Sequence, residues 1–241
     1  MSAARRGVSG NVLKLIGALS MVLDHVGVIL FPEMEIFRIL GRLAFPLFAF
    51  MIAEGCRYTR HKWRYFGSVF GVAALCQIVL YLYNRSLEMS ALITFSISIL
   101  LVYALQWFCA HFFALDTKPA LRIGVLFTLL SGIGGVLILD LFVDLDYGAV
   151  GCLLPLFAAV PYAINKESGK RTHLISVGAF GVGLVLLSLV QQGVQIFSLF
   201  ALPLLLAYSG ERGKAKLKYF FYVFYPAHLL ALEGIAILLH A

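Results

Sequence analysis

The sequence predicts an all-α membrane protein: a single polytopic bundle of about nine transmembrane helices, with a cytoplasmic N-terminus. The 241 residues are 61% hydrophobic and only 13% charged, and their mean hydropathy is +0.94. This apolar share exceeds that of soluble domains. Many apolar runs are long enough to cross a bilayer core of about 30 Å as helices. The gaps between the runs are short, so we expect one transmembrane domain over residues 1–241.

The individual helices follow from the apolar segments in chain order, each separated from the next by polar or turn-forming residues. The predicted helices span residues 11–31, 36–55, 66–83, 91–113, 121–143, 147–164, 174–190, 194–208 and 219–240. The segments on either side of 144–148 and of 191–193 can also be interpreted as broken helices.

The basic residues predict how these helices are oriented. Sixteen of the 19 Lys and Arg residues fall on the side that holds the N-terminus, and the exceptions are Arg38, Arg42 and Arg85. Cytoplasmic loops of membrane proteins are enriched in Lys and Arg. Nine spans with the N-terminus inside and the C-terminus outside fit this distribution. The net charge of +7 therefore reports orientation, and we expect no nucleic-acid partner.

The cysteines and glycines predict packing and no chemistry. The four cysteines lack a CxxC pair, so neither a disulfide framework nor a metal site is expected. Small residues let membrane helices approach closely. Such residues are Gly67, Gly71, Gly132, Gly134 and Gly135.

Asp24 and His25 lie inside the first apolar segment. An ionisable side chain at membrane depth costs on the order of 3 kcal/mol on insertion scales and usually marks function. Consecutive helical residues point about 100° apart and do not face each other. Each of the two side chains therefore needs a partner from another helix.

Arg38 and Arg42 are the first candidate partners. They share one face of the second segment, and the proline at position 46 removes the backbone bond to the Arg42 carbonyl. His25 and Arg42 each lie about six residues, roughly 9 Å, below the outer edge. We expect a cationic, partly unwound pocket in which Asp24 neutralises Arg42 or Arg38. The alternative is an ion pair that only fixes helix register.

Further polar residues lie near the outer level or deeper. Asp140 lies near the end of the fifth segment, Asp144 and Asp146 lie between the fifth and sixth, and Tyr147 opens the sixth. His228, with Pro226 just before it, is expected near mid-membrane, deeper than His25. Glu54, at the inner end of its helix, is expected to reach water by snorkelling.

Several blocks of this sequence resemble the TraX family of membrane proteins. They are Leu13-Lys14, Met21-Val22-Leu23-Asp24-His25-Val26-Gly27, Gly41-Arg42-Leu43-Ala44-Phe45-Pro46-Leu47-Phe48, Thr94, Asp146-Tyr147-Gly148 and Phe224-Tyr225-Pro226-x-His228. The resemblance implies N-acetylation of pilin in the bacterial inner (cytoplasmic) membrane. It also implies kinship with transmembrane acyltransferases, in which a membrane histidine serves transfer from cytoplasmic acyl-CoA.

The resemblance, taken with these ionisable residues, implies a membrane acetyltransferase as the expected function, with acetyl-CoA as donor and no metal. His25 would be the general base, Arg42 would orient or neutralise the carbonyl oxygen, and Asp24 would hold Arg42. The acceptor is an amine or hydroxyl of a pilin N-terminus or a cell-surface polymer, and membrane lipid is the other partner. The residues expected to bind substrate are Arg38, Asp140, Asp146, Tyr147, Thr94, Tyr225 and His228.

Two alternatives remain open. A transporter or flippase also places ionisable residues and helix-breaking prolines at mid-membrane, although inverted repeats are missing. A structural membrane subunit explains the hydrophobicity but not the ionisable residues of the first, second and last segments.

Overall fold

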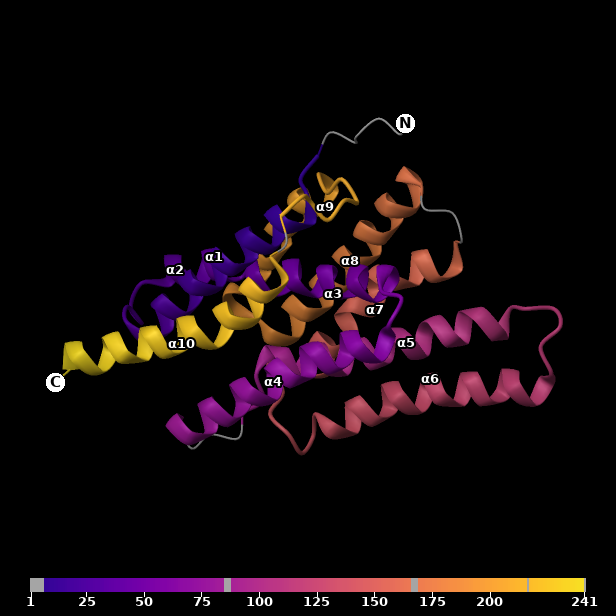
Figure 1. The fold of residues 1–241 in the computed structure, drawn as a ribbon, viewed down its shortest axis with the longest axis horizontal. Helices are drawn as coiled ribbons and strands as arrows, with labels where there is room; N and C mark the ends of the chain where they lie inside the picture. Colours follow the sequence, from indigo (N-terminus) through magenta and orange to yellow (C-terminus); the bar gives the residue numbers. More distant parts are fainter. Residues whose placement is uncertain (1–6, 85–87, 166–168, 216, 241) are drawn as a thin grey trace. The chain divides into compact units, whose positions relative to one another are not determined.

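The computed structural model describes residues 7–84, 88–165, 169–215 and 217–240 (Figure 1). This part of the chain is about 80% helical and contains no strand. The helices are α1 (Gly10–Ile29), α2 (Glu35–Gly41), α3 (Ala44–Tyr58), α4 (Lys62–Asn84), α5 (Ala91–Phe112), α6 (Pro119–Leu139), α7 (Gly148–Ile164), α8 (Lys170–Gln191), the 3₁₀ helix η1 (Gly193–Phe200), α9 (Ala201–Leu206) and α10 (Lys218–His240). The all-helical prediction is confirmed. Arg85, which entered the orientation count, lies outside the described residues.

Each predicted segment corresponds to helix, but two of the nine are divided. The second becomes α2 and α3, and the eighth becomes η1 and α9. Among the described residues, six helical stretches are long and apolar enough to cross a membrane. They indicate a multi-pass membrane protein. The apolar stretches Gly148–Ile164, Gly193–Leu206 and Val223–Leu238 are shorter, so nine spans and their orientation stay predictions.

The chain forms two compact units. Unit 1 contains residues Met1–Met51 and Gln191–Ala241, and unit 2 contains Ile52–Val190. Each unit is described by itself below. The organisation as one domain over residues 1–241 stays a prediction.

In unit 1, α1 packs against α2 and α10, which lie beside it in Figure 1. The segment before α1 is bonded to the connection that follows α9. Val8 N donates to the Ala207 carbonyl (2.8 Å), and Asn11 N donates to the Arg212 carbonyl (2.9 Å). The start of α1 and this connection therefore lie at the same end of unit 1, as the charge distribution requires.

In unit 2, α5 packs against α4, α6 and α7. The turn between α5 and α6 lies on the right in Figure 1. Buried hydroxyls join neighbouring helices: Ser98 Oγ donates to the Cys152 carbonyl (2.8 Å), and Ser176 Oγ donates to the Ala158 carbonyl (2.7 Å). Such bonds hold helices together where apolar packing provides no preference over lipid.

Two hydrogen bonds fix connections of unit 2. At one end Met89 N donates to the Asp144 carbonyl (2.8 Å), which joins the α4–α5 and α6–α7 connections. Elsewhere, Tyr103 Oη in the second half of α5 donates to the Lys62 carbonyl at the start of α4 (3.1 Å). The side of the membrane that each of these connections faces stays a prediction.

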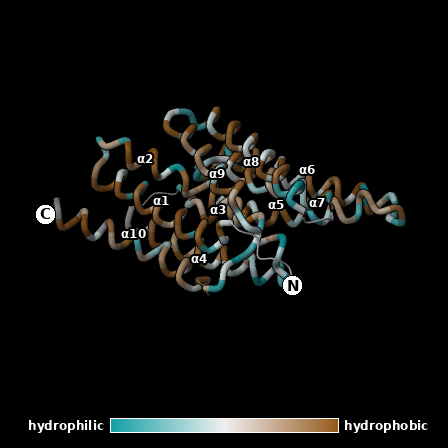
Figure 2. Tube along the Cα trace, turned by 90° about the horizontal axis from the view of Figure 1, so that it is seen from above, coloured by the Kyte–Doolittle hydropathy of each residue, from teal (hydrophilic) through white to brown (hydrophobic). Residues whose placement is uncertain are grey.

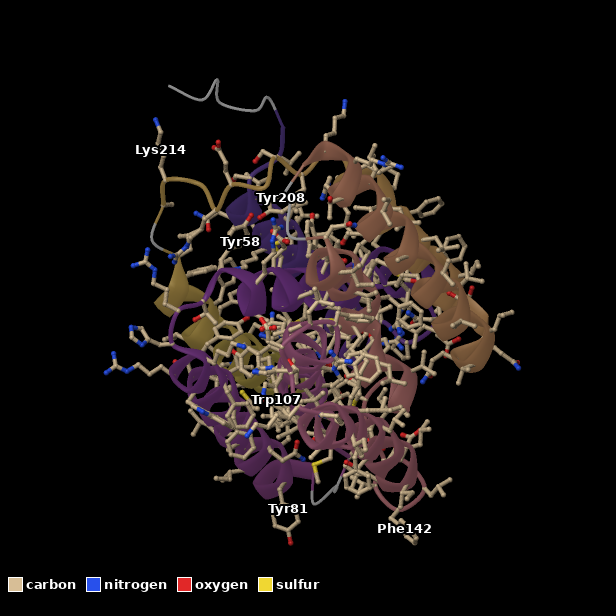
Figure 3. All side chains as sticks on the ribbon, turned by 90° about the vertical axis from the view of Figure 1, so that its right-hand side faces the viewer. Tyr58, Tyr81, Trp107, Phe142, Tyr208 and Lys214 are labelled. Carbon is tan, nitrogen blue, oxygen red and sulfur yellow. The ribbon has the colours of Figure 1, made fainter. Side chains whose placement is uncertain are left out.

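Large apolar side chains cover much of the outside of the helices. Phe127 is 71% exposed on α6, and Phe142, just after α6, is 82% exposed and points away from the ribbon in Figure 3. Figure 2 shows hydrophobic residues over most of the length of the helices. Exposed apolar surface of this kind marks contact with lipid or another protein.

The glycine packing predictions had mixed outcomes. A Cβ at Gly67, Gly71, Gly134 or Gly135 would meet nothing within 4 Å, so their predicted role in close helix approach is wrong. At Gly132 a Cβ would lie 3.2 Å from Leu101 Cδ2. That glycine does allow α6 to approach α5.

Candidate active site

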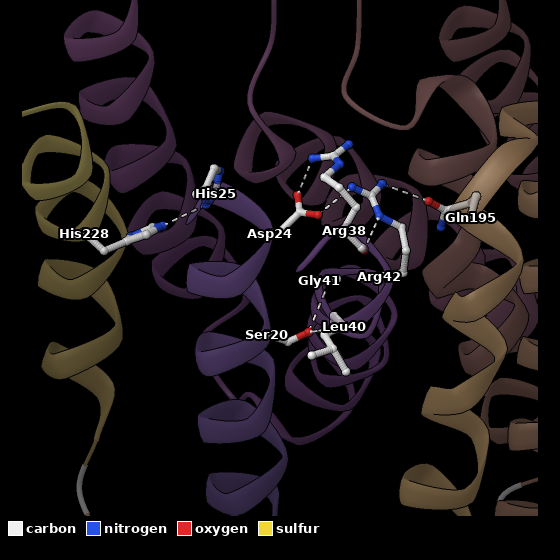
Figure 4. Close-up of polar contacts among 9 residues, drawn as sticks. All are labelled: Ser20, Asp24, His25, Arg38, Leu40, Gly41, Arg42, Gln195 and His228. Carbon is white, nitrogen blue, oxygen red and sulfur yellow. Dashed lines mark hydrogen bonds and ion pairs between the residues drawn. The ribbon is translucent and has the colours of Figure 1, made fainter. Parts of the chain in front are cut away.

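The site of unit 1 is built on the two faces of α1. Figure 4 shows Asp24 turned towards α2 and His25 turned towards α10. This separation follows from the 100° that one helical residue turns, as predicted. Each side chain finds its partners on a different helix.

Asp24 bonds two guanidinium groups. Its Oδ1 accepts from Arg42 Nη2 at 2.6 Å, and its Oδ2 accepts from Arg38 Nη1 at 3.1 Å. The Asp24 side chain is 17% exposed, that of Arg42 10% and that of Arg38 33%. The prediction that Asp24 neutralises Arg42 or Arg38 is confirmed, and it contacts both.

Arg42 is held from three directions. Besides Asp24, its Nη1 donates to Gln195 Oε1 (3.2 Å) and its Nε donates to the Arg38 carbonyl (3.3 Å). Gln195 lies in η1 and is 3% exposed. Gln195 was not predicted from the sequence. The signal that could have found it is an amide side chain inside the apolar run 194–208, because such a residue needs a polar partner.

The backbone of α2 approaches α1 closely beside this network. Ser20 Oγ donates to the carbonyl of Leu40 and to that of Gly41 (3.2 Å for the second). A Cβ at Gly41 would overlap the Asp24 carboxylate. Glycine at position 41 is therefore required for the contact between α2 and Asp24.

The helix is interrupted at Arg42, where we expected it. The seven residues of α2 end at Gly41 and α3 begins at Ala44. The proline at position 46 has no N–H to offer the Arg42 carbonyl. The cationic side chains and the interruption are both present, and the pocket stays a prediction.

His25 contacts His228 on the other face of α1. His25 Nδ1 and His228 Nε2 are 3.1 Å apart, and the ring centroids are 5.0 Å apart. His228 is 8% exposed, and the Tyr225 ring lies 5.7 Å from it, edge to face. The contact brings the two rings together, and which of them lies deeper in the membrane stays a prediction.

The site of unit 1 has a positive electrostatic balance. The side chains of Arg38, Arg42 and Asp24 carry a formal net charge of +1. In a low-dielectric environment such a charge attracts an anion or a developing oxyanion far more strongly than in water. His25, on the face of α1 that is turned towards α10, adds an imidazole that can take a proton.

The remaining predicted site residues belong to unit 2. Thr94 is completely buried, and its Oγ1 donates to the Asp146 carbonyl (2.8 Å). Tyr147, just before α7, has a left-handed backbone (φ 64°). The Asp140 carboxylate lies close to Gly148, since a Cβ added to Gly148 would be 3.2 Å from Asp140 Oδ2. These contacts shape the turn between α6 and α7. A role of these residues in substrate binding stays a prediction.

Glu54 corrects another expectation. It is 5% exposed, and its Oε1 accepts from Arg57 Nη1 at 3.0 Å. The Arg57 guanidinium lies 3.7 Å from the centroid of the Tyr162 ring, and Tyr162 Oη lies 3.1 Å from His173 Nδ1. Glu54 is paired inside unit 2, so the prediction that it snorkels to water is wrong.

Comparisons with known proteins identify one family. The family model described as TraX protein matches residues 9–236. An uncharacterized protein of Rickettsia prowazekii (strain Madrid E) is 45% identical over 40 residues, which are 17% of this chain and 16% of that protein. The chain thus matches only a small part of that relative's length. No solved structure matches the chain.

Proposed function

The chain belongs to the TraX family, and from this premise we propose that it is an integral membrane acetyltransferase. It moves an acetyl group from cytoplasmic acetyl-CoA to an amine or hydroxyl at the outer face of the bacterial inner membrane. The observation that carries the proposal is the charged network of Asp24, Arg38 and Arg42 beside His25. All four residues lie within two candidate spans, Gly10–Ile29 and Glu35–Tyr58. Ionisable residues at such depth are costly and mark function.

The two arginines supply the electrostatic part of the reaction. When the acceptor attacks the acetyl carbonyl, negative charge develops on the carbonyl oxygen. Arg42, fixed by Asp24, Gln195 and the Arg38 carbonyl, is pre-organised to stabilise that charge. Pre-organised donors cost no reorganisation at the moment of reaction, and removing one such donor lowers kcat by roughly 10² to 10³.

His25 supplies the proton transfer. The acceptor nitrogen or oxygen forms a bond to the acetyl carbon as its proton moves to the His25 imidazole. The carbon–sulfur bond of the thioester then breaks, and the CoA thiolate leaves and takes up a proton. Imidazole suits this step because its ordinary pKa is near neutrality, and positioned acid–base catalysis contributes about 10² to 10⁴ in rate.

The acceptor proposed here is a pilin N-terminus or a cell-surface polymer. A cytoplasmic donor and an external acceptor would meet at the site through the membrane-embedded part of unit 1. The basic connections at 57–64 and 212–218 would face the donor side, and they offer cations for the phosphates of acetyl-CoA. In unit 1, Arg38 and Tyr225 remain the proposed substrate-binding residues. A role of Thr94, Asp140, Asp146 and Tyr147 of unit 2 in binding substrate stays a prediction.

The test is acetyl transfer by the purified protein in liposomes that carry acetyl-CoA on one side and peptide amines or polysaccharide hydroxyls on the other. We expect the acceptor to gain the mass of one acetyl group. His25→Ala should reduce transfer by about 10² or more, while acetyl-CoA binding and insertion persist.

His111→Ala is the matched control for loss of a histidine. His111 lies in α5 of unit 2 and contacts the Trp107 carbonyl (3.0 Å). Its removal should leave transfer unchanged. Near-normal turnover by a well-folded His25→Ala protein would defeat the proposal and reduce the network of Asp24 to a structural ion pair. Movement of an unmodified substrate across the bilayer would instead favour a transporter or flippase, which also uses interrupted helices.

A further inference from the structure

The contact between His25 and His228 determines which ring nitrogen of His25 can act as a base. Neutral imidazole has one N–H donor and one acceptor nitrogen, and the second contact of a ring selects between the two forms. Both rings have such second contacts in unit 1. The nitrogen that carries the proton can therefore be assigned first in His228 and then in His25.

His228 is the end at which the assignment starts. Its Nδ1 lies 2.9 Å from the Phe224 carbonyl, one turn earlier in α10. A carbonyl oxygen only accepts, so His228 Nδ1 carries the proton. In the neutral ring, Nε2 is then an acceptor.

His25 must match that acceptor. Its Nδ1 lies 3.1 Å from His228 Nε2, so His25 Nδ1 carries the proton and donates it. The Met21 carbonyl, one turn before His25, is a second acceptor beside the same ring. The lone pair of His25 is consequently on Nε2.

The orientation of the His228 ring is fixed by its neighbours. Phe224 stacks on it with centroids 5.1 Å apart and ring planes at 10°, and Tyr225 meets it edge to face. A ring flip would separate Nδ1 from the Phe224 carbonyl and point Nε2 away from His25. The stacking fixes the plane of the ring, and the two hydrogen-bond contacts that a flip would lose preserve the proton arrangement.

We propose that His228 is a positioning residue that holds His25 in the tautomer with a free Nε2 and stabilises the imidazolium formed there. This proposal rests on the proposed function for its catalytic consequence. The acceptor proton is bound by His25 Nε2, while the proton on His25 Nδ1 remains shared with the neutral His228 Nε2. The histidine pair thus gains one proton from the acceptor, and it later gives one proton to the leaving CoA thiolate.

Nitrogen NMR of the two rings tests the assignment without turnover. In ¹⁵N-histidine-labelled protein in lipid bilayers, the wild-type His25 and His228 should both show a protonated Nδ1 and an unprotonated Nε2. His228→Phe keeps an aromatic ring beside Phe224 but removes the acceptor. In this variant the His25 signals should shift to a mixture of tautomers, whereas His111→Phe should leave them unchanged.

Kinetics test the consequence for catalysis. His228→Phe should lower kcat by about tenfold or more, because a general base in the wrong tautomer loses most of its contribution, with KM nearly unchanged. His228→Gln offers a carbonyl oxygen to His25 Nδ1 and should recover part of kcat and the tautomer. An Nε2-protonated His25 in the wild type, or a His25 signal unaffected by His228→Phe, would overturn the proposal. Absence of acetyl transfer with the expected wild-type signals and their shift in His228→Phe would instead reject the proposed function and support the tautomer assignment.

Discussion

At the scale of single residues, Asp24 has one oxygen for each of two guanidinium groups. Asp24→Asn keeps the shape of the side chain but leaves Arg42, which is 9% exposed, without its anionic neighbour. Breaking a buried pair by removing one charge costs about 3 kcal/mol or more. We expect a marked fall in the thermal unfolding temperature of the protein in nanodiscs, together with loss of transfer.

A double-mutant cycle distinguishes that charge effect from a general loss of packing. Arg42→Met added to Asp24→Asn should restore part of the lost stability, because the unpaired cation is then gone. Arg38→Gln is the milder comparison, since the Arg38 side chain is 33% exposed and exposed pairs contribute little. Equal destabilisation by Asp24→Asn, by the double variant Asp24→Asn/Arg42→Met and by Arg38→Gln would contradict the charge explanation.

At the scale of elements, the interruption between α2 and α3 places Arg42. Pro46→Ala adds an N–H that can donate to the Arg42 carbonyl. We expect α3 to lengthen towards α2, which would turn Arg42 away from Asp24. Hydrogen exchange of the amides at 42–46 should slow, and transfer should fall.

The control for the proline change is in unit 2. Pro155 lies inside α7, where Pro155→Ala should slow local exchange with little effect on transfer. An interruption that persists in Pro46→Ala, with unchanged exchange, would show that the proline does not cause it.

The helices could be predicted from the sequence to within a few residues at most ends because apolar run length and charged gaps are local properties. The region around Gln195 could not. Gln192 and Gly193 have positive φ angles (54° and 55°) and lead into a 3₁₀ helix rather than an α-helix. An apolar run alone does not distinguish these helix types.

The site could be predicted in part. The neighbourhood of Asp24 and Arg42 followed from helix periodicity and the antiparallel order of consecutive segments. The partner of His25 did not, because the crossing of α1 and α10 depends on packing between residues about 200 positions apart. Glu54 was misjudged for a different reason: its partner Arg57 lies only three residues further along α3, and this local pairing was not considered.

At the scale of the whole molecule, the alternation of connections predicts membrane orientation. Reporter fusions after Lys62, Lys170 and Lys214 should score cytoplasmic, and fusions after Glu88 and Asp144 external, because basic connections stay inside. Lys214 points outward from the connection before α10 (Figure 3). An external score at Lys214 would contradict both the nine-span arrangement and a cytoplasmic N-terminus, since residues 8–11 are bonded to 207–212.

The division of unit 1 between both ends of the sequence has a consequence for biosynthesis. Asp24, Arg38 and Arg42 all precede residue 52, so their charges can pair as soon as the first helices have entered the membrane. His228 is synthesised only after the whole of unit 2. The costly charges are thus neutralised early, whereas the histidine pair is assembled last. In the nascent chain, the first helices can therefore enter the membrane with their charges paired long before His228 is present to orient His25.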